Sequence, residues 1–421
     1  MYKLLTISAF ILLCCIFSGK KTDMTSKNIQ NELGSSEYEE STDAANELVA
    51  IPIFSKTSNI NNNLSAIAAD ISFVQMDFDP PFNDFHISDI ALSENHIFLS
   101  TLSSITSYDW NGKFIRQIGS RGQGPREYVQ ITSPLQIDHK NKLIYVQDLI
   151  RKVIVYRFDG TFEKSFQLKD MDGKIALIDA SVLALRQTDV DRRKNPSPLI
   201  QFVDNNGSEI KTYWSNHYPI PREKQQLLAS MNPLWNYNSG IYYLEFGADT
   251  IFRISGNSMI PSRVLTGNLK LNVVESNSGK VGNKLRIARR TMYPDGCIFE
   301  SDRFMVFRLS DDFECFYMMY DKKEKRLHRT YHKNATEDRI SGTKIMAHFY
   351  DDVASGLDFY PLCQSMGKMI GLLPAFEIFE KKKEILDFIA KNPNDSSNRL
   401  KQIVQEITED HNSVLMLVTL K

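Results

Sequence analysis

One pattern of apolar and polar residues recurs in the first half of the chain. Side chains of the two kinds alternate through residues 105–110, a tight turn follows at Asn111-Gly112, and a second strand-like stretch begins at Phe114. Alternation with a period of two is typical of a half-buried β-strand, and Asn-Gly supplies the positive φ angles of a two-residue turn. The segment therefore predicts a β-hairpin.

The hairpin pattern recurs twice downstream at a nearly constant step. Its turn glycines are Gly112, Gly160 and Gly207, which are 48 and then 47 residues apart. The apolar triplets before the first two hairpins, at residues 97–99 and 144–146, keep the same step of 47 residues. A fixed step of this size, filled with short strands, is typical of a β-propeller in which each repeat is a four-stranded blade. Three unrelated hairpins of a β-sandwich are the less favoured interpretation.

Further segments extend the pattern to six blades. The polar stretch 268–295 interrupts it and is interpreted as an excursion that is partly helical. The first five blades are predicted at residues 86–119, 131–168, 174–215, 233–254 and 297–332.

The last blade is predicted to be assembled from both ends of the chain. Its C-terminal strands are residues 357–362, 368–379 and 414–420, interrupted by apolar residues spaced three and four apart at 380–391 and 398–410, which predict a helical insertion. The alternating segment Ile71–Phe78 has no neighbouring partner, so we expect it to supply the missing fourth strand beside residues 414–420. The fold class is therefore all-β, a six-bladed propeller of four-stranded antiparallel blades closed by an N-terminal strand.

The first fifteen residues predict export and lipid attachment. A single Lys precedes the apolar run Leu4–Leu13, which is shorter than the ~20 residues of a membrane-spanning helix and typical of a secretory signal. The run ends in Leu12-Leu13-Cys14-Cys15, which resembles a bacterial lipobox, and we expect Cys15 to carry the lipid. An ordinary cleaved signal is the alternative, but Ile16-Phe17-Ser18 offers no small-residue cleavage site. A multiply acylated Cys15 would be a stable membrane anchor.

A polar segment separates this signal from the folded domain. Residues 16–65 are rich in Asn, Ser, Lys and Glu, which predicts a flexible tether. The domains are therefore a signal at 1–15, a tether at 16–65 and a propeller at 66–421.

Charge and cysteine content narrow the possible functions. The 421-residue chain has a net charge of −1, which argues against a nucleic-acid partner because such partners usually require a basic face. Beyond Cys15 the cysteines are odd in number and imply no disulfide framework. Cys297 and Cys315 fall in one predicted blade, where they could pair or remain buried thiols.

A glycine-rich loop is the candidate ligand site. Residues 119–125 suggest a phosphate loop, but Pro125 and a strand follow where such a loop needs a helix N-terminus. We interpret the segment as an interblade loop on the same face as the turns between the second and third strands of each blade. Its candidate ligand-binding residues are Arg121, Gln123, Arg126 and Glu127. The alternative is that Arg126 and Glu127 only pair with neighbouring loops.

Catalytic and metal-binding patterns are weak in this sequence. His328 and His332 lie on a predicted strand, where a separation of four residues spans ~13 Å rather than one metal site. A calcium ion in the central channel would need carboxylates from several blades, for which Asp89 and Asp138 are candidates. We therefore predict no catalytic residues and no cofactor, with calcium expected only if the propeller is a hydrolase.

Several short sequence segments resemble a known protein family. They are Asn111–Ile115, Ile118-Gly119, Gly122–Pro125 with Glu127-Tyr128, Asp249–Ile254 and Asn412–Leu415. Together they are similar to the six-bladed β-propeller lipoproteins of Gram-negative bacteria, which share the NHL-like fold. That family usually has Asp-Asn-Pro-Val near its end, whereas this chain has Asp-His-Asn-Ser-Val at 410–414. The resemblance implies a lipid-anchored location in the cell envelope, such as the outer membrane, and it implies no catalytic residues.

Two functions remain open from the sequence. The first is a non-enzymatic propeller, tethered to the envelope membrane, that binds a glycan, a peptide or a partner protein. The second is a calcium-dependent hydrolase or lactonase of the six-bladed kind, which would require several carboxylates converging on the channel.

Overall fold

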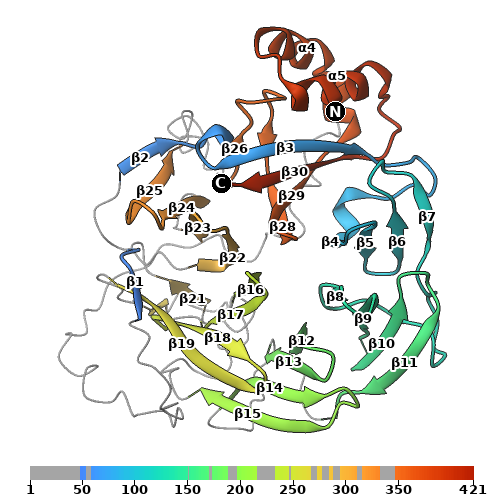
Figure 1. Cartoon of the computed structure of the whole chain (residues 1–421), viewed down its shortest axis with the longest axis vertical. Coiled ribbons are helices and arrows are strands. Elements are labelled where there is room, and N and C mark those ends of the chain that lie inside the picture. Colours follow the sequence, from blue (N-terminus) through green and yellow to red (C-terminus); the bar gives the residue numbers. More distant parts are fainter. Residues whose placement is uncertain are drawn as a thin grey trace.

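The computed structural model describes most of the chain from Leu48 onward. Six antiparallel sheets are arranged around a central axis, and the first strand of each blade lies nearest that axis (Figure 1). The predicted six-bladed propeller is therefore confirmed. The described residues are 48–53, 58–149, 151–169, 173–187, 197–215, 233–245, 248–266, 273–276, 284–287, 294–310, 315–331 and 347–421.

The first three blades follow the predicted repeats. Blade 1 contains β4 (Ile87–Leu92), β5 (Ile97–Thr101), β6 (Ile105–Tyr108) and β7 (Phe114–Gln117). Blade 2 contains β8 (Gln136–Asp138), β9 (Leu143–Gln147), β10 (Lys152–Arg157) and β11 (Phe162–Gln167). Blade 3 contains β12 (Gly173–Leu177), β13 (Val182–Gln187), β14 (Ser197–Asp204) and β15 (Glu209–Ser215).

The other three blades complete the ring. Blade 4 contains β16 (Leu234–Tyr237), β17 (Gly240–Leu244), β18 (Thr250–Ser255) and β19 (Ser258–Leu265). Blade 5 contains β22 (Pro294–Glu300), β23 (Phe304–Ser310), β24 (Cys315–Asp321) and β25 (Arg326–Tyr331). Blade 6 contains β28 (Pro361–Ser365), β29 (Lys368–Leu373), β30 (Val414–Leu420) and β3 (Ala68–Gln75).

The recurring turn glycines are explained by contact between neighbouring blades. Gly112 and Gly207 have φ angles of +84° and +80°, and a Cβ atom on them would lie 1.9 Å and 2.1 Å from the carbonyl oxygens of Gln75 and Gln167. These two residues end β3 and β11, the outer strands of the preceding blades. A side chain at either glycine would collide with that strand, so the repeat keeps glycine for both conformation and space.

Closure of the ring occurs as predicted. β3 pairs antiparallel with β30, and Ile71 lies opposite Val418. The buried Asn412 reinforces this contact: its side chain donates to the carbonyl oxygens of Asp77 and Pro80 and accepts from the Phe82 amide at 3.0 Å. Asn412, within the segment 410–414, thus holds the closing strand.

The start of the domain differs from the prediction. β1 (Val49–Ile51) and β2 (Ser58–Asn61) pair in parallel with β19 and β25, adding a fifth, outermost strand to blades 4 and 5 (Figure 1). Residues 48–53 and 58–65 therefore lie on the ring, and the predicted bounds of the tether were wrong for them. These residues join the ring because the otherwise polar stretch contains three apolar side chains that are buried. Ile51, Ile53 and Leu64 are each at most 1% exposed. Residues 16–47 of that segment lie outside the described residues.

Two short hairpins and a helical insertion accompany the blades. β20 (Val273–Ser276) pairs with β21 (Lys284–Ile287), so the described parts of the excursion at 268–295 are strands rather than helix. β26 (Phe349–Tyr350) pairs with β27 (Asp358–Phe359), and short 3-10 turns are η1 (Leu64–Ala66) and η2 (Asp84–His86). The helices inserted in blade 6 are α3 (Ala375–Glu380), α4 (Lys382–Lys391) and α5 (Asp395–Glu406).

Pro374 corrects one predicted boundary. The strand expected at 368–379 ends at Leu373, because proline has no N–H for the ladder but is compatible with a helix start, and α3 begins at the next residue. In the described part of the chain, none of the helices has the length and apolar character needed to cross a membrane.

The backbone also resolves the question of a disulfide. Cys297 lies on β22 and Cys315 on β24, which flank β23 on opposite sides. Two strand spacings separate their backbones by about 10 Å, whereas a disulfide needs Cα atoms within ~7 Å. These two cysteines are therefore too far apart to pair.

Truncation should distinguish the closing strand from the residues before it. A variant lacking residues 1–78 loses β3, exposes the faces of blades 6 and 1, and should not give a cooperatively unfolding monomer. A control lacking only residues 1–61 also loses β1 and β2 but keeps β3, so it should still unfold cooperatively as a monomer. Differential scanning calorimetry of both variants is the measurement, and equal transitions would contradict the closure mechanism.

Candidate functional site

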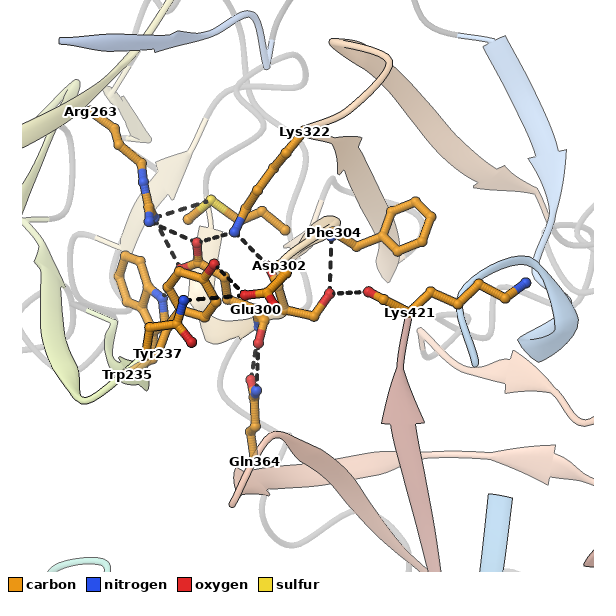
Figure 2. A network of polar contacts seen from close by, with 12 residues as sticks. Trp235, Tyr237, Arg263, Glu300, Asp302, Phe304, Lys322, Gln364 and Lys421 are labelled. Carbon is orange, nitrogen blue, oxygen red and sulfur yellow. Dashed lines mark hydrogen bonds and ion pairs between the residues drawn. The ribbon is translucent and has the colours of Figure 1, made fainter. Parts of the chain in front are cut away.

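A buried glutamate joins blades 4, 5 and 6. Glu300 ends β22, and its side chain is fully buried. Trp235 Nε1 donates to Glu300 Oε2 at 2.7 Å, and the Arg263 guanidinium binds both carboxylate oxygens at 3.0 Å and 2.8 Å. Lys322 Nζ lies 2.6 Å from Glu300 Oε1 (Figure 2). One carboxylate thus holds side chains from β16, from β19 and from the turn after β24.

Aromatic rings cover the two cations. The Arg263 guanidinium lies 4.5 Å from the centre of the Tyr242 ring, and Lys322 Nζ lies 4.0 Å from the centre of the Tyr237 ring. Burial lowers the pKa of Lys322, while the Glu300 carboxylate acts in the opposite direction. Breaking a buried ion pair is costly, and here two cations face the Glu300 carboxylate while its Oε2 atom accepts hydrogen bonds from Trp235 and Arg263.

The backbone around Glu300 extends the junction into blade 6. The Gln364 side chain accepts from the Glu300 amide at 2.8 Å and donates to the Glu300 carbonyl oxygen at 2.7 Å. Ser301 Oγ donates to the Lys421 carbonyl oxygen at 2.6 Å. The last residue of the chain is therefore tied to the same point (Figure 2).

The exposed rim of this cluster contains a fixed carboxylate. Asp302 Oδ1 accepts from the Tyr237 hydroxyl at 2.9 Å and from Asn238 Nδ2 at 3.2 Å. These hydrogen bonds lower the pKa of Asp302, so the carboxylate is ionised at neutral pH. Burial and the neighbouring Asp302 raise the pKa of Tyr237. Because Lys322 and Arg263 both lie over the Tyr237 ring, the cluster is built as a structural junction rather than as a platform for stacking a ligand.

Sequence reasoning did not find this cluster. Trp235 and Glu300 are 65 positions apart, and the members come from different blades. The only signal in the sequence was a glutamate that ends an apolar strand, which by itself is also typical of a surface turn.

The predicted glycine-rich loop lies on the expected face. It runs between β7 and β8 and is held by the turn that joins β9 to β10, which is a turn between second and third strands. Lys152 Nζ donates to the carbonyl oxygens of Gly124 at 3.1 Å and Glu127 at 2.5 Å. Asp148 Oδ1 accepts the amides of Val129 and Gln130, each at 2.9 Å. The location of the loop is therefore confirmed, and its backbone is fixed.

The predicted site residues divide into two groups. Glu127 is half-buried and accepts the Gly124 amide at 2.9 Å, so it stabilises the loop itself. Arg126 is exposed and lies 5.3 Å from the centre of the Phe162 ring of blade 2. Arg121 and Gln123 are exposed. Whether any of the four binds a ligand stays a prediction.

The candidate calcium ligands are engaged in local structure. Asp89 Oδ2 accepts the Leu135 amide at 2.9 Å, and Asp138 accepts the Asn141 amide at 2.9 Å and Asn141 Nδ2 at 2.7 Å. Burial raises the pKa of Asp89 to about 6, while Lys174 on β12 acts in the opposite direction. Within the described ranges, no three His, Cys, Asp or Glu side chains are grouped so that they could hold a metal ion. Cys15 and His332 lie outside the described residues.

Comparison with known proteins places the chain in a family. A model described as a domain of unknown function, DUF4934, matches residues 48–419. The chain belongs to this family. The match starts at the residue where the described propeller begins, which agrees with β1 and β2 being part of the domain.

Among solved structures, a Bacteroides fragilis protein provisionally described as exported has the same fold. It is 17% identical, with a TM-score of 0.62 over 89% of this chain and 99% of that chain. BamB from Moraxella catarrhalis matches at 12% identity and a TM-score of 0.33 over 62% of this chain and 63% of that one. The extracellular domain of a Bacteroides thetaiotaomicron one-component system matches at 11% identity and a TM-score of 0.37, over 62% and 30% of the two chains. A search of the curated proteins finds no match.

Removing the charge of Glu300 should destabilise the fold. Glu300→Gln keeps an acceptor for Trp235 but leaves Arg263 and Lys322 without a counter-charge, and breaking such a buried pair costs about 3–5 kcal/mol. Urea unfolding measures the loss. The matched control is Glu324→Gln, which alters an exposed pair with Arg326 on the same blade and should cost under about 0.5 kcal/mol. Equal effects would show that the cluster does not hold the blades together.

The Asp89 carboxyl should make stability depend on pH. Its folded pKa of about 6 exceeds the unfolded value of ~3.9, so its favourable contribution is present below pH ~4 and is lost as the pH rises through 6. Asp89→Asn retains an acceptor for Leu135 but cannot ionise. The variant should therefore match the wild type at pH 4 and be more stable at pH 7 by about 1–3 kcal/mol, measured by thermal unfolding. A difference that is constant with pH would argue against this assignment.

Proposed function

We propose that this protein is an exported propeller, anchored to the cell envelope by a lipid on Cys15, that captures a partner protein or peptide without catalysis. The apolar run that ends at Cys15 supports the location, as does the shared fold with a Bacteroides protein provisionally described as exported. The binding surface, here called the loop face, consists of Leu102, residues 120–128 and Leu149.

The observation that carries this proposal is a rigid loop flanked by exposed apolar side chains. Leu102 and Leu149 are 42% and 55% exposed. The Ile131 amide donates to the Leu102 carbonyl oxygen at 2.9 Å, and the Leu149 amide donates to the Gln130 carbonyl oxygen at 2.8 Å. Both leucines are therefore fixed beside the same short segment that follows the glycine-rich loop.

The exposed chemistry of the loop face suits a protein surface. Arg121 and Arg126 carry planar guanidinium groups that bind carboxylates through two hydrogen bonds. The leucines supply apolar contact, and the backbone is already ordered by Lys152, so little conformational entropy is lost when a partner binds. A partner segment with acidic side chains next to apolar ones matches this combination better than a glycan does.

Capture from envelope extracts tests the loop face. The full chain is immobilised, and proteins that it retains are identified and quantified, then compared with those retained by two variants. Arg121→Ala with Arg126→Ala removes the charge, and Leu102→Ser with Leu149→Ser removes the apolar contact. Each double variant should reduce capture of a specific partner by at least about tenfold, which corresponds to 1.4 kcal/mol.

A control on another face accompanies this experiment. Lys323→Ala with Arg326→Ala removes the same charge from the exposed turn of blade 5 and should leave capture unchanged. Thermal melts establish that every variant is folded. Undiminished capture by both folded loop-face variants would move the site elsewhere and leave this loop with a structural role.

A further inference from the structure

Two successive blades carry a fifth strand on their outer edge. β1 pairs in parallel with the end of β19, and β2 pairs in parallel with the end of β25 (Figure 1). Ile51 lies opposite Leu265, the last residue of β19, and Asn61 lies opposite Tyr331, the last residue of β25. Because Ile51 and Asn61 are ten residues apart, the chain advances along the outside of the ring by one blade for every ten residues.

The same step leads backward from blade 4 to blade 3. The residue ten positions before Ile51 is Ser41, and the outer strand of blade 3, β15, ends at Ser215. Seven residues, 42–48, connect Ser41 to β1, whereas six residues, 52–57, make the equivalent connection from β1 to β2. The chain before β1 is therefore long enough to reach β15.

The outer side of β15 has the character of an incomplete edge. Among the strands that the structure describes, β15 pairs only with β14. It carries two large apolar side chains that are exposed, Ile210 at 43% and Trp214 at 42%. An edge of this kind pairs readily with another extended segment, and proteins usually cover or blunt it. On blades 4 and 5 a segment of this chain already covers the equivalent edge.

The sequence before β1 complements one side of β15 in charge. Residues 36–43 contain four acidic residues and no basic one. When Ser41 is aligned with the end of β15, Glu37 falls opposite Lys211 and Glu39 falls opposite the next residue but one of that strand, Tyr213. Lys211 Nζ lies 4.8 Å from the centre of the Tyr213 ring, so both glutamates face the same cation.

The other side of β15 is complemented by an aromatic residue. In the same alignment Tyr38 falls opposite Thr212, whose side chain points to the alternate side of the strand from Lys211 and Tyr213. Trp214 is on the same side as Thr212. Tyr38 therefore meets the exposed indole, and cross-strand contacts between aromatic side chains stabilise such pairs.

We propose that the outer edge of blade 3 is a binding site for residues 37–41 of the same chain, which add to β15 as a parallel fifth strand. Because seven residues tether this segment to β1, its effective concentration at β15 is in the millimolar range, which is enough to populate a weak pairing. The link to the lipid proposed at Cys15 then comprises residues 16–36 only, and it leaves the ring at blade 3. The strand site is independent of the loop face and of the lipid.

Hydrogen–deuterium exchange of the full chain, resolved by mass spectrometry, tests the site. The amides of residues 38–41 should exchange at least about tenfold more slowly than those of residues 24–28, once intrinsic rates are taken into account. Trp214→Ser removes the apolar side of the contact and Lys211→Glu reverses the charge of the other side. Each should abolish the protection of residues 38–41, while protection of the other blades shows that the variant is folded.

A charge swap tests the register. Glu37→Lys with Glu39→Lys should remove the protection in the wild-type background and restore it in the Lys211→Glu background. The matched control is Glu32→Lys with Asp43→Lys, which makes the same change of charge outside the paired residues and should leave the protection unchanged.

Three results would overturn the proposal. The first is exchange of residues 38–41 in the wild type at the rate of residues 24–28. The second is protection that survives in both β15 variants or is not restored by the charge swap. The third is protection that increases with protein concentration, because the segment would then be bound by a second copy of the chain rather than by its own ring.

Discussion

Pairing of the first blade-forming strand with the last is the contact on which the other interfaces of this ring depend. β3 and β30 place Ala68 opposite Leu420, and next to these strands Phe82 and Asn412, which are 330 positions apart, are joined by a hydrogen bond. A propeller blade buries its faces only against its neighbours, so an open ring would expose two faces at once. The close approach of Gly112 to the Gln75 carbonyl oxygen belongs to the same contact, because it seats the hairpin of blade 1 against the closing strand.

Within the closed ring, polar side chains connect one blade to the next. Gln147 donates to the Gly173 carbonyl oxygen at 2.5 Å and accepts the Ile175 amide at 3.0 Å, just as Gln364 bridges the backbone of Glu300. Ser365 Oγ accepts the Leu92 amide at 2.9 Å and connects blades 6 and 1. Short inner strands leave backbone groups without a partner in their own sheet, and these side chains satisfy them. The Glu300 cluster links neighbouring blades in the same way but through charged side chains, and the C-terminal residue Lys421 is attached at the same place.

The two faces of the ring and the outer edge of blade 4 therefore differ in which side chains remain exposed. The turns that carry Asp302 and Lys322 are committed to joining blades, and the aromatic rings there are covered by cations. The opposite face presents a loop whose backbone is fixed and whose Arg and Leu side chains remain exposed. The outer edge of blade 4 is already occupied by an extended segment. A fixed backbone with exposed side chains suits the binding role proposed for the loop face.

The sequence by itself determined the repeat, the number of blades, the closing strand and the place of the glycine-rich loop. Each of these depends on local signals, such as alternation in Ile71–Phe78 or the Asn-Gly turn at 111–112, and such signals survive in any tertiary context. Only the tertiary structure decided that residues 48–53 and 58–65 belong to the ring, because Ile51, Ile53 and Leu64 become anchors only where neighbouring blades provide apolar clusters for them. It alone revealed the junction of Glu300 with Trp235, Arg263 and Lys322, since burial of a charge depends on partners that the blades bring together from distant positions. The alternation of apolar and polar residues indicates which face of a strand is buried. Which residues of the neighbouring blades pack against that face is decided only when the whole ring closes.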